Sequence, residues 1–198
     1  MMLATTECQK EGQAEGRYTV AEFEKAYLSP ENNHRLFELI NGKVCEKMPT
    51  QQHGLIASHI NVALALYARQ YKSGRPGVEV RHQVPGDKQN SRLPDVSFVC
   101  AKDPLVEQGS VPTMPDLAVE IKSPSDTITD MRETAAYYLA NGSRLVWLVY
   151  PNYRLVEVYR TDADIEFFGE DDTLTGGEAL PDFTLPVREI FADPLAES

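Results

Sequence analysis

The stretch that decides the fold is residues 93–126, LPDVSFVCAKDPLVEQGSVPTMPDLAVEIKSPSD. Within it, residues 95–100 and 117–121 are apolar runs rich in β-branched side chains, and such runs predict strands. A helix is expected next, with Ser125 or Asp126 as its N-cap, because both residue types cap helices well. Two strands followed by a helix indicate an α/β domain.

Two turn signals and one periodic segment place further elements before this stretch. Thr19 and Glu22 have the spacing of a capping box, which predicts the start of a helix. Asn41-Gly42 lies between two β-prone runs and predicts a β-hairpin. Residues 53–72 carry apolar side chains at helical spacing, so a second helix is expected there.

More strands are expected on either side of the deciding stretch. Residues 78–84 precede it, and residues 145–150 and 154–160 follow it. The wholly apolar run at 145–150 is typical of a strand buried on both faces. Residues 164–168 are expected to pair with the preceding strand, and a short element is expected near 187–191. These elements together predict a mixed central β-sheet flanked by helices, with an N-terminal helix and hairpin.

Length and composition predict one ordinary globular domain. The chain has 198 residues, with 42% hydrophobic residues, 25% charged residues and a formal net charge of −11. We expect a disordered leader at 1–16, one domain at 17–192 and a tail at 193–198. The polar leader does not look like a secretory signal, and no apolar run approaches the roughly 20 residues that a membrane helix needs. A cytoplasmic protein is therefore expected.

The cysteines point to the same compartment. Cys8, Cys45 and Cys100 are odd in number, lie far apart and form no CxxC motif. This usage favours reduced thiols over a disulfide framework or a zinc site. Cys45 and Cys100 lie in apolar runs and are expected to be packing residues.

The charge is unevenly distributed. Residues 157–198 hold twelve acids and two bases, whereas residues 69–92 hold six bases and two acids. A locally basic face could contact a phosphate backbone on an acidic protein, and a scattered solvated surface is the equally weighted alternative. The candidate residues for DNA-backbone contact are Arg69, Lys72, Arg75, Arg81, Lys88 and Arg92.

Two carboxylates and a lysine form the candidate reactive group. Asp95 stands at the start of one expected strand and Glu120 near the end of another, 25 residues later, an interval that suits neighbouring strands. Lys122 follows at the alternating position on the face of Glu120. A hard cation such as Mg²⁺ takes one or two carboxylates and keeps several waters. It can lower the pKa of a bound water, while a lysine orients that water or stabilises developing charge.

The wider pattern resembles the PD…ExK site of restriction-endonuclease-like nucleases, and within them the Uma family of putative restriction endonucleases. The resemblance covers residues 18–191 and rests on the order and spacing of several motifs. These motifs are FELING at 37–42, LPDVSFV at 93–99, PDLAVEIKSPSD at 115–126, YLANG at 138–142, VWLV at 146–149 and LPDF at 180–183.

The resemblance implies a role for each residue of the site. It implies Asp95 and Glu120 as metal ligands and Lys122 as the catalytic lysine. Independently of the resemblance, the backbone carbonyl of Ile121 could be a third ligand of such a cation. Many members carry a lysine at the position of Thr134, so any phosphate contact from that lysine would be absent here or pass to Arg132. Second-tier candidates are Glu38, Glu46, His53 and Asp116, the last as an alternative to Asp95 in holding the metal.

The resemblance implies an endonuclease that uses Mg²⁺ or Mn²⁺ to hydrolyse DNA phosphodiester bonds. A two-fold homodimer or higher oligomer is expected, because duplex DNA has matching symmetry. The main alternative is a catalytically silent nuclease-fold module that binds a protein or nucleic acid, since a fold does not determine a function. A nuclease that works only within a larger assembly, with an unknown protein partner, is a third possibility.

Overall fold

The computed structural model describes residues 7–8, 17–32, 34–102, 104–193 and 195. The expected leader at 1–16 lies outside the described residues except for Glu7–Cys8, which forms the short strand β1. Of the expected tail, only residues 193 and 195 are described.

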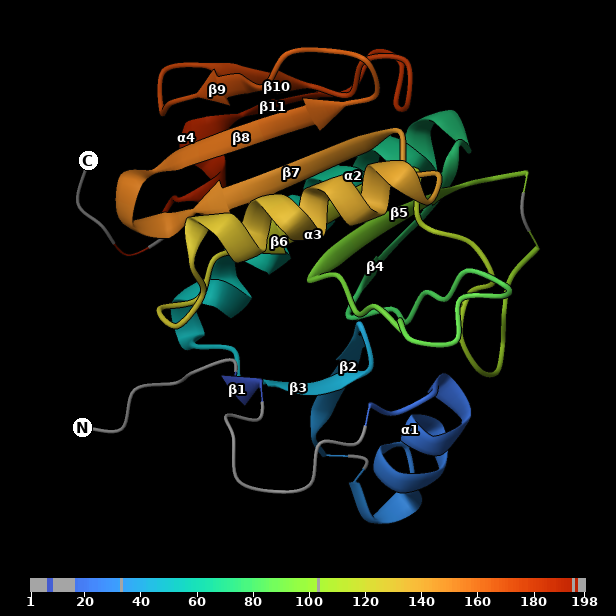
Figure 1. The fold of residues 1–198 in the computed structure, drawn as a ribbon. Coiled ribbons are helices and arrows are strands. Elements are labelled where there is room, and N and C mark those ends of the chain that lie inside the picture. The colour runs from blue at the N-terminus through green and yellow to red at the C-terminus, as the bar shows by residue number, and fades with distance from the viewer. Residues whose placement is uncertain (1–6, 9–16, 33, 103, 194, 196–198) are drawn as a thin grey trace.

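The N-terminal part is a helix packed beside a small antiparallel sheet (Figure 1). Thr19 caps the helix through the expected capping box with Glu22. At the turn of the hairpin, Asn41 and Gly42 both have positive φ, 50° and 80°, as a tight two-residue turn requires. The elements are α1 (Val20–Tyr27), the 3-10 helix η1 (Pro30–Asn32), β2 (Leu36–Ile40) and β3 (Lys43–Lys47), with β1 paired to β3.

A mixed six-stranded sheet forms the centre of the molecule, in the order β4-β5-β6-β7-β8-β9. Only β6 and β7 run parallel, and the other neighbours are antiparallel. The strands are β4 (Gly74–Val78), β5 (Val96–Cys100), β6 (Leu117–Ile121), β7 (Leu145–Tyr150), β8 (Leu155–Arg160) and β9 (Glu166–Phe168). The strands β6 and β7 are buried along their whole length, as the apolar run at 145–150 predicted.

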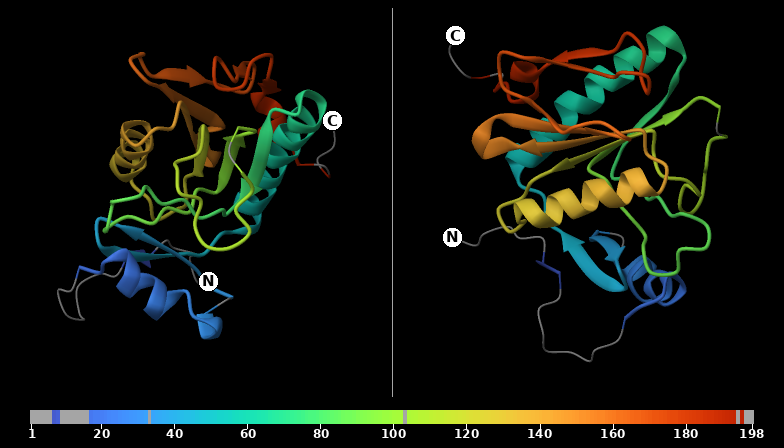
Figure 2. Two further views of the ribbon diagram at one scale, coloured as in Figure 1. Left: turned by 90° about the vertical axis from the view of Figure 1, so that its right-hand side faces the viewer. Right: turned by 45° about the horizontal axis from the view of Figure 1, so that its top comes forward.

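One helix covers each face of this sheet (Figure 2). The helix α2 (Gln51–Tyr71) packs on one face, around Ile60, Leu64 and Trp147. The helix α3 (Ile128–Ala140) packs on the other, around Tyr138 and Leu148. The expected architecture of a mixed sheet flanked by helices is therefore confirmed.

The C-terminal part completes the core on the α2 side. A two-stranded sheet pairs β10 (Thr173–Thr175) with β11 (Thr184–Pro186), and the short helix α4 (Val187–Ile190) follows. The side chains of Leu174, Leu185 and Ile190 join the same apolar cluster as α2. The turn η2 (Pro151–Tyr153) joins β7 to β8.

The prediction of a strand at 78–84 is wrong, because the strand is β4, at Gly74–Val78. Gly74, Pro76 and Gly77 look like helix-breaking loop residues in sequence. An edge strand tolerates proline, however, because one side of its backbone needs no partner. Gly74 is needed there, since a Cβ atom would lie 2.4 Å from the ring of Phe98.

The prediction that the cysteines are reduced thiols is wrong for Cys45, which forms a disulfide. Cys100 is a free thiol and half-buried. The side chain of Cys45 is fully buried, as expected.

Candidate active site

Asp95 and Glu120 meet at adjacent ends of two neighbouring strands. The antiparallel register pairs Val96 of β5 with Val119 of β6, so the residue before one and the residue after the other lie at the same end. The carboxylate of Asp95 reaches across and accepts a hydrogen bond of 2.7 Å from the backbone amide of Ile121. The two side chains are 3% and 10% exposed. The interval between Asp95 and Glu120 thus indicated their proximity correctly.

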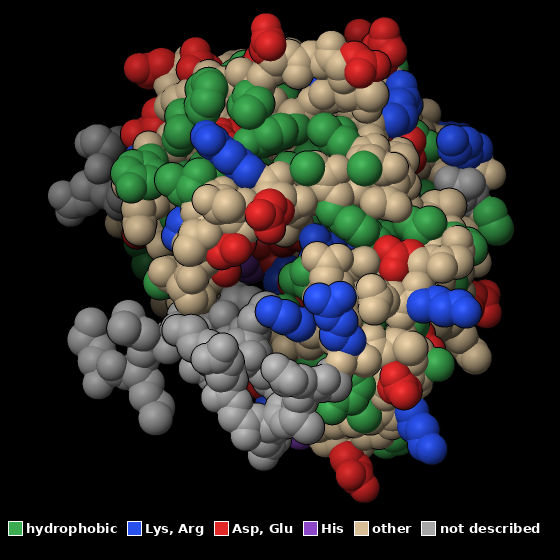
Figure 3. Space-filling model, viewed as in Figure 1, with side chains coloured by type: hydrophobic (Ala, Val, Ile, Leu, Met, Phe, Trp, Pro, Cys, Tyr) green, Lys and Arg blue, Asp and Glu red, His purple; other side chains and the backbone are tan. Residues whose placement is uncertain are grey.

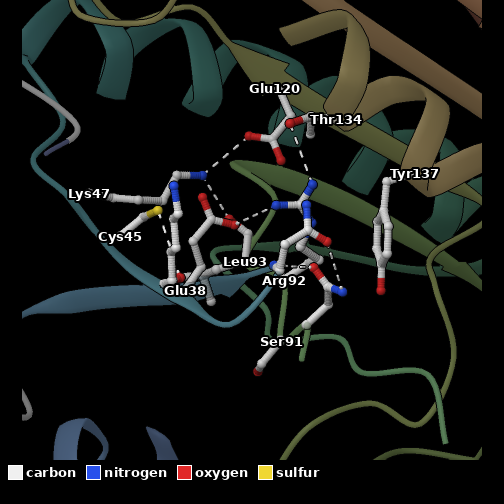
Figure 4. A network of polar contacts seen from close by, with 12 residues as sticks. Glu38, Cys45, Lys47, Ser91, Arg92, Leu93, Glu120, Thr134 and Tyr137 are labelled. Atoms are coloured by element: carbon white, nitrogen blue, oxygen red, sulfur yellow. Dashed lines mark hydrogen bonds and ion pairs between the residues drawn. The ribbon is translucent and has the colours of Figure 1, made fainter. Parts of the chain in front are cut away.

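A lysine from the hairpin links the two carboxylates. Lys47, the last residue of β3, donates to Asp95 Oδ1 at 2.7 Å and to Glu120 Oε2 at 3.2 Å. Its third hydrogen bond, 2.8 Å long, goes to the carbonyl of Leu93. Figure 4 shows the Lys47 side chain extending from the hairpin toward Glu120. A single ammonium therefore lies where both carboxylates converge.

Two further side chains satisfy the remaining carboxylate oxygens. His53, in the first turn of α2, places Nε2 3.0 Å from Asp95 Oδ2. Tyr138, on α3, donates its hydroxyl to Glu120 Oε1 at 2.7 Å. Both helices that cover the sheet therefore contribute to the site, and each of the four carboxylate oxygens has a donor.

The environment separates the acidities of the two carboxyl groups. Burial disfavours the charged form of Asp95, but Lys47 and the hydrogen bond from His53 outweigh it and hold the pKa of Asp95 well below its usual range. Burial raises the pKa of Glu120, and repulsion from the charge of Asp95 raises it further. The attraction of Lys47 lowers it but does not outweigh these two effects. Such a split between neighbouring carboxyl groups is typical of functional sites.

Both basic partners of the carboxylates, Lys47 and His53, have raised pKa values. Burial disfavours the ammonium of Lys47, yet the attraction of Asp95 and Glu120 outweighs it and raises the pKa of Lys47 well above its ordinary value. Burial also opposes the charged form of His53, and the hydrogen bond to Asp95 still raises its pKa. Lys47 is thus held as a cation.

A second pair of oppositely charged side chains, Glu38 and Arg92, lies beside the carboxylates and Lys47. Glu38 of β2 is buried, and Arg92 Nη1 lies 3.8 Å from Glu38 Oε2. The guanidinium of Arg92 lies over the rings of Tyr137 and Tyr138. Its Nη2 is 3.4 Å from the hydroxyl of Thr134 (Figure 4). Arg92 is only 2% exposed, and two of its three guanidinium nitrogens lack a hydrogen-bond partner.

Two second-tier candidates lie away from the carboxylates. Glu46 points to the other side of the hairpin and binds Arg35 through both oxygens. Asp116 stands at the opposite end of β6 from Glu120 and accepts a hydrogen bond of 2.8 Å from the amide of Cys100. Of the four, Glu38 and His53 are the ones near the site.

Lys122 lines a pocket next to the site. Its ammonium donates to the carbonyl of Ser123 at 3.0 Å. The strand β6 ends at Ile121, so the alternation that would place Lys122 beside Glu120 stops one residue earlier. The pocket has a volume of about 400 Å³, and His53 is part of its wall as well. Its lining includes Thr50, Gln51, Gln52, His53, Lys122, Ser123, Pro124, Ile128, Tyr150, Pro151, Asn152 and Tyr153.

The basic residues of 69–92 do not act as one group. Arg81 and Arg92 turn inward, and Arg81 donates to the carbonyl of Phe37 at 2.6 Å. Figure 3 shows the Lys and Arg side chains of one face interspersed with acidic and neutral ones. The exposed members are Arg69, Lys72, Arg75 and Lys88.

Arg132 lies on a different side of α3 from Thr134 and binds Glu157, with Nη2 2.6 Å from Oε1. The cation next to Thr134 is instead Arg92. The cation beside Thr134 is therefore the buried Arg92, whereas Arg132 is engaged with Glu157.

The donor set fits a hard divalent cation. Within the described ranges, no three His, Cys, Asp or Glu side chains are grouped so as to hold a metal ion. Mg²⁺ needs only one or two carboxylates, because waters fill its other positions. Asp95 and Glu120 already converge on one positive charge, the ammonium of Lys47. A metal ion at this point would replace that ammonium as the shared partner.

Sequence reasoning missed Lys47 and Tyr138 as parts of the site. One signal for Lys47 was available, because strand alternation places it on the same face as the fully buried Cys45. Tyr138 stands in the YLANG motif at 138–142, and its hydroxyl was the unused signal, since a buried phenol usually has a partner.

The fold and the paired carboxylates define a protein of the nuclease-like α/β class. A model of the Uma2 family, described as putative restriction endonucleases, matches residues 20–188, so the chain belongs to that family. A solved structure from Anabaena variabilis, a putative nuclease belonging to DUF820, has 27% identity and a TM-score of 0.74. The match covers 87% of this chain and 97% of that one. No curated protein matches.

None of the described helices combines the length and the apolar character needed to cross a bilayer.

Proposed function

We propose that this protein is an endonuclease that hydrolyses DNA phosphodiester bonds with the help of Mg²⁺ or Mn²⁺. One observation carries the proposal: two buried carboxylates from neighbouring strand ends converge on a single cation. The family and the solved relative support a nuclease.

In this proposal, Asp95 and Glu120 hold the metal ion, and the carbonyl of Ile121 is a further candidate ligand. The bound ion would polarise the phosphodiester and lower the pKa of an attacking water. His53 and the amide of Ile121 fix the orientation of Asp95, and Tyr138 fixes that of Glu120. Such neighbours keep ligands in place and tune their basicity.

The pocket beside His53 gives the substrate strand a place next to the carboxylates. Lys122 is proposed to contact the phosphate or the attacking water from this side, as the ExK pattern implies. The exposed bases Arg69, Lys72, Arg75 and Lys88 are proposed as outer contacts to the DNA backbone. A homodimer would let two such sites act on both strands of a duplex.

The test combines metal titration with plasmid cleavage. Wild type should bind Mn²⁺ in a calorimeter and nick supercoiled plasmid, whereas Asp95→Asn and Glu120→Gln should do neither. Asp116→Asn is the matched control, because it removes a carboxylate at the opposite end of β6. This variant should still bind Mn²⁺ and nick the plasmid. Undiminished cleavage in Asp95→Asn would refute the site. Metal binding without cleavage in wild type would favour the catalytically silent module or a missing partner.

A further inference from the structure

Lys47 is the one residue that contacts both carboxylates among the described residues, and neither the ExK pattern nor the family match assigns it a role. Its ammonium makes three hydrogen bonds, to Asp95, Glu120 and Leu93, and its side chain is 11% exposed. Lys122, the lysine of the pattern, donates to Ser123 instead. Because Lys47 contacts the carboxylates and Lys122 lines the neighbouring pocket, the two lysines should have different roles.

We propose that Lys47 is the working lysine of the carboxylate site, holding the cation position until a divalent ion arrives and then acting beside the reacting phosphate. This inference rests on the proposed function. It assigns the lysine role to a residue of the hairpin and leaves Lys122 to the neighbouring pocket.

The first half of the role follows from charge. Two buried carboxylates at one point repel each other, and a buried charge without a partner is strongly destabilising. The ammonium of Lys47 removes this repulsion and keeps both carboxylates aimed at one position. A divalent ion that takes this position must displace Lys47 from at least one carboxylate, so the two cations compete.

The second half follows from the anchor on Leu93. The carbonyl of Leu93, 2.8 Å from the ammonium, is not part of the carboxylate pair. A displaced Lys47 can therefore keep this hydrogen bond and stay at the edge of the site. An ammonium held there in a buried environment would stabilise negative charge that develops on the phosphate.

The decisive variant is Lys47→Met, whose unbranched side chain reaches the position of the lysine Cε and lacks the ammonium. Without the competing ammonium, Mn²⁺ should bind roughly tenfold tighter or more than in wild type, measured by calorimetry. Cleavage at saturating Mn²⁺ should nevertheless fall about a hundredfold, the scale of losing one charge-stabilising donor. A merely structural lysine would not give tighter binding together with slower cleavage.

The metal-free protein provides a readout independent of cleavage. Without Mn²⁺, Lys47→Met should melt roughly 6 to 12 °C below wild type, because its two carboxylates lose their shared cation. Added Mn²⁺ should raise its melting temperature more than that of wild type. Lys43→Met is the matched control, since Lys43 lies exposed at the other end of β3 and should leave all three measurements unchanged.

Lys47→Arg keeps the charge and guards against a variant that does not fold. It should remain folded without metal and bind Mn²⁺ no more tightly than wild type. Equal or weaker Mn²⁺ binding by Lys47→Met, or tighter binding with undiminished cleavage, would overturn the proposal. Failure of the proposed function would look different, because wild type itself would then neither bind Mn²⁺ nor cleave DNA.

Discussion

Tyr138→Phe tests whether the hydroxyl on α3 tunes Glu120, one of the two carboxylates proposed to hold the metal ion. The hydroxyl of Tyr138 is fully buried and donates to Glu120 at 2.7 Å, a short distance typical of a hydrogen bond to a charged oxygen. Such bonds contribute about 1.5–3 kcal/mol. At 1.36 kcal/mol per pKa unit, losing this bond should raise the pKa of Glu120 by about one to two units.

The sign of the effect on metal binding follows from the starting pKa. Burial already raises the pKa of Glu120, and the hydrogen bond from Tyr138 opposes that rise. In Tyr138→Phe, less Glu120 is ionised at pH 7, and only the ionised form can hold a metal ion. Mn²⁺ affinity at pH 7 should therefore drop about tenfold, because a rise of one unit in pKa lowers the ionised fraction of Glu120 about tenfold. The affinity should recover as the pH is raised.

The assay is calorimetric titration of Mn²⁺ at several pH values, with Tyr137→Phe as the matched control. Tyr137 is the adjacent tyrosine, and its hydroxyl donates to Asp87 at 2.9 Å, away from the carboxylates. Tyr137→Phe should keep the wild-type affinity. An equal loss in both variants, or a loss in Tyr138→Phe that higher pH does not restore, would refute the reasoning.

Three stability predictions can be measured by urea unfolding. Burial lowers the pKa of His82 to about 4, against the hydrogen bond to Thr113, so the folded state resists protonation that the unfolded chain accepts near 6.5. The free energy of unfolding should thus fall by about 3 kcal/mol between pH 6.5 and 4, and His82→Asn should flatten this dependence. Gly74→Ala should destabilise by about 1–3 kcal/mol through the clash with Phe98. Gly54→Ala, in α2, where the added carbon would meet no atom within 4 Å apart from its chain neighbours and the backbone of its own helix, should stabilise by about 0.5–1 kcal/mol.

Each of these predictions has a result that would contradict it. A His82→Asn protein with the same acid sensitivity as wild type would place the titrating group elsewhere. A Gly74→Ala protein as stable as wild type would mean that β4 shifts away from Phe98 without cost. Destabilisation by Gly54→Ala would show that the first turn of α2 is constrained by more than its helical backbone.

Local signals predicted the elements whose ends are set by neighbouring residues. Thr19 caps α1 through a contact three residues away, and Asn41-Gly42 turns the hairpin through its own backbone angles. β4 was misplaced because its identity depends on its position at the sheet edge, where Pro76 and Gly74 are tolerated. Whether such a segment forms a strand depends on its tertiary contacts, and a short window of sequence does not contain that information.

The candidate site likewise has residues that the sequence predicts and others that it does not. Asp95 and Glu120 could be predicted, because strand alternation and a 25-residue interval bring neighbouring strand ends together. Lys47 reaches them only because the hairpin docks against the loop before β5, through backbone bonds between Leu39 and Ser91. That docking depends on contacts between distant segments, and the spacing of residues within one motif does not encode it.

The chain separation within the site has a consequence for protein synthesis. Lys47 is 48 residues from Asp95 and 73 residues from Glu120, and β6 gains its parallel partner only when β7 has been made. A ribosome-bound chain that has exposed the hairpin and α2 therefore carries the lysine without either carboxylate. Incomplete chains released early should therefore lack the converging carboxylates, and the complete site forms only after most of the chain has been translated.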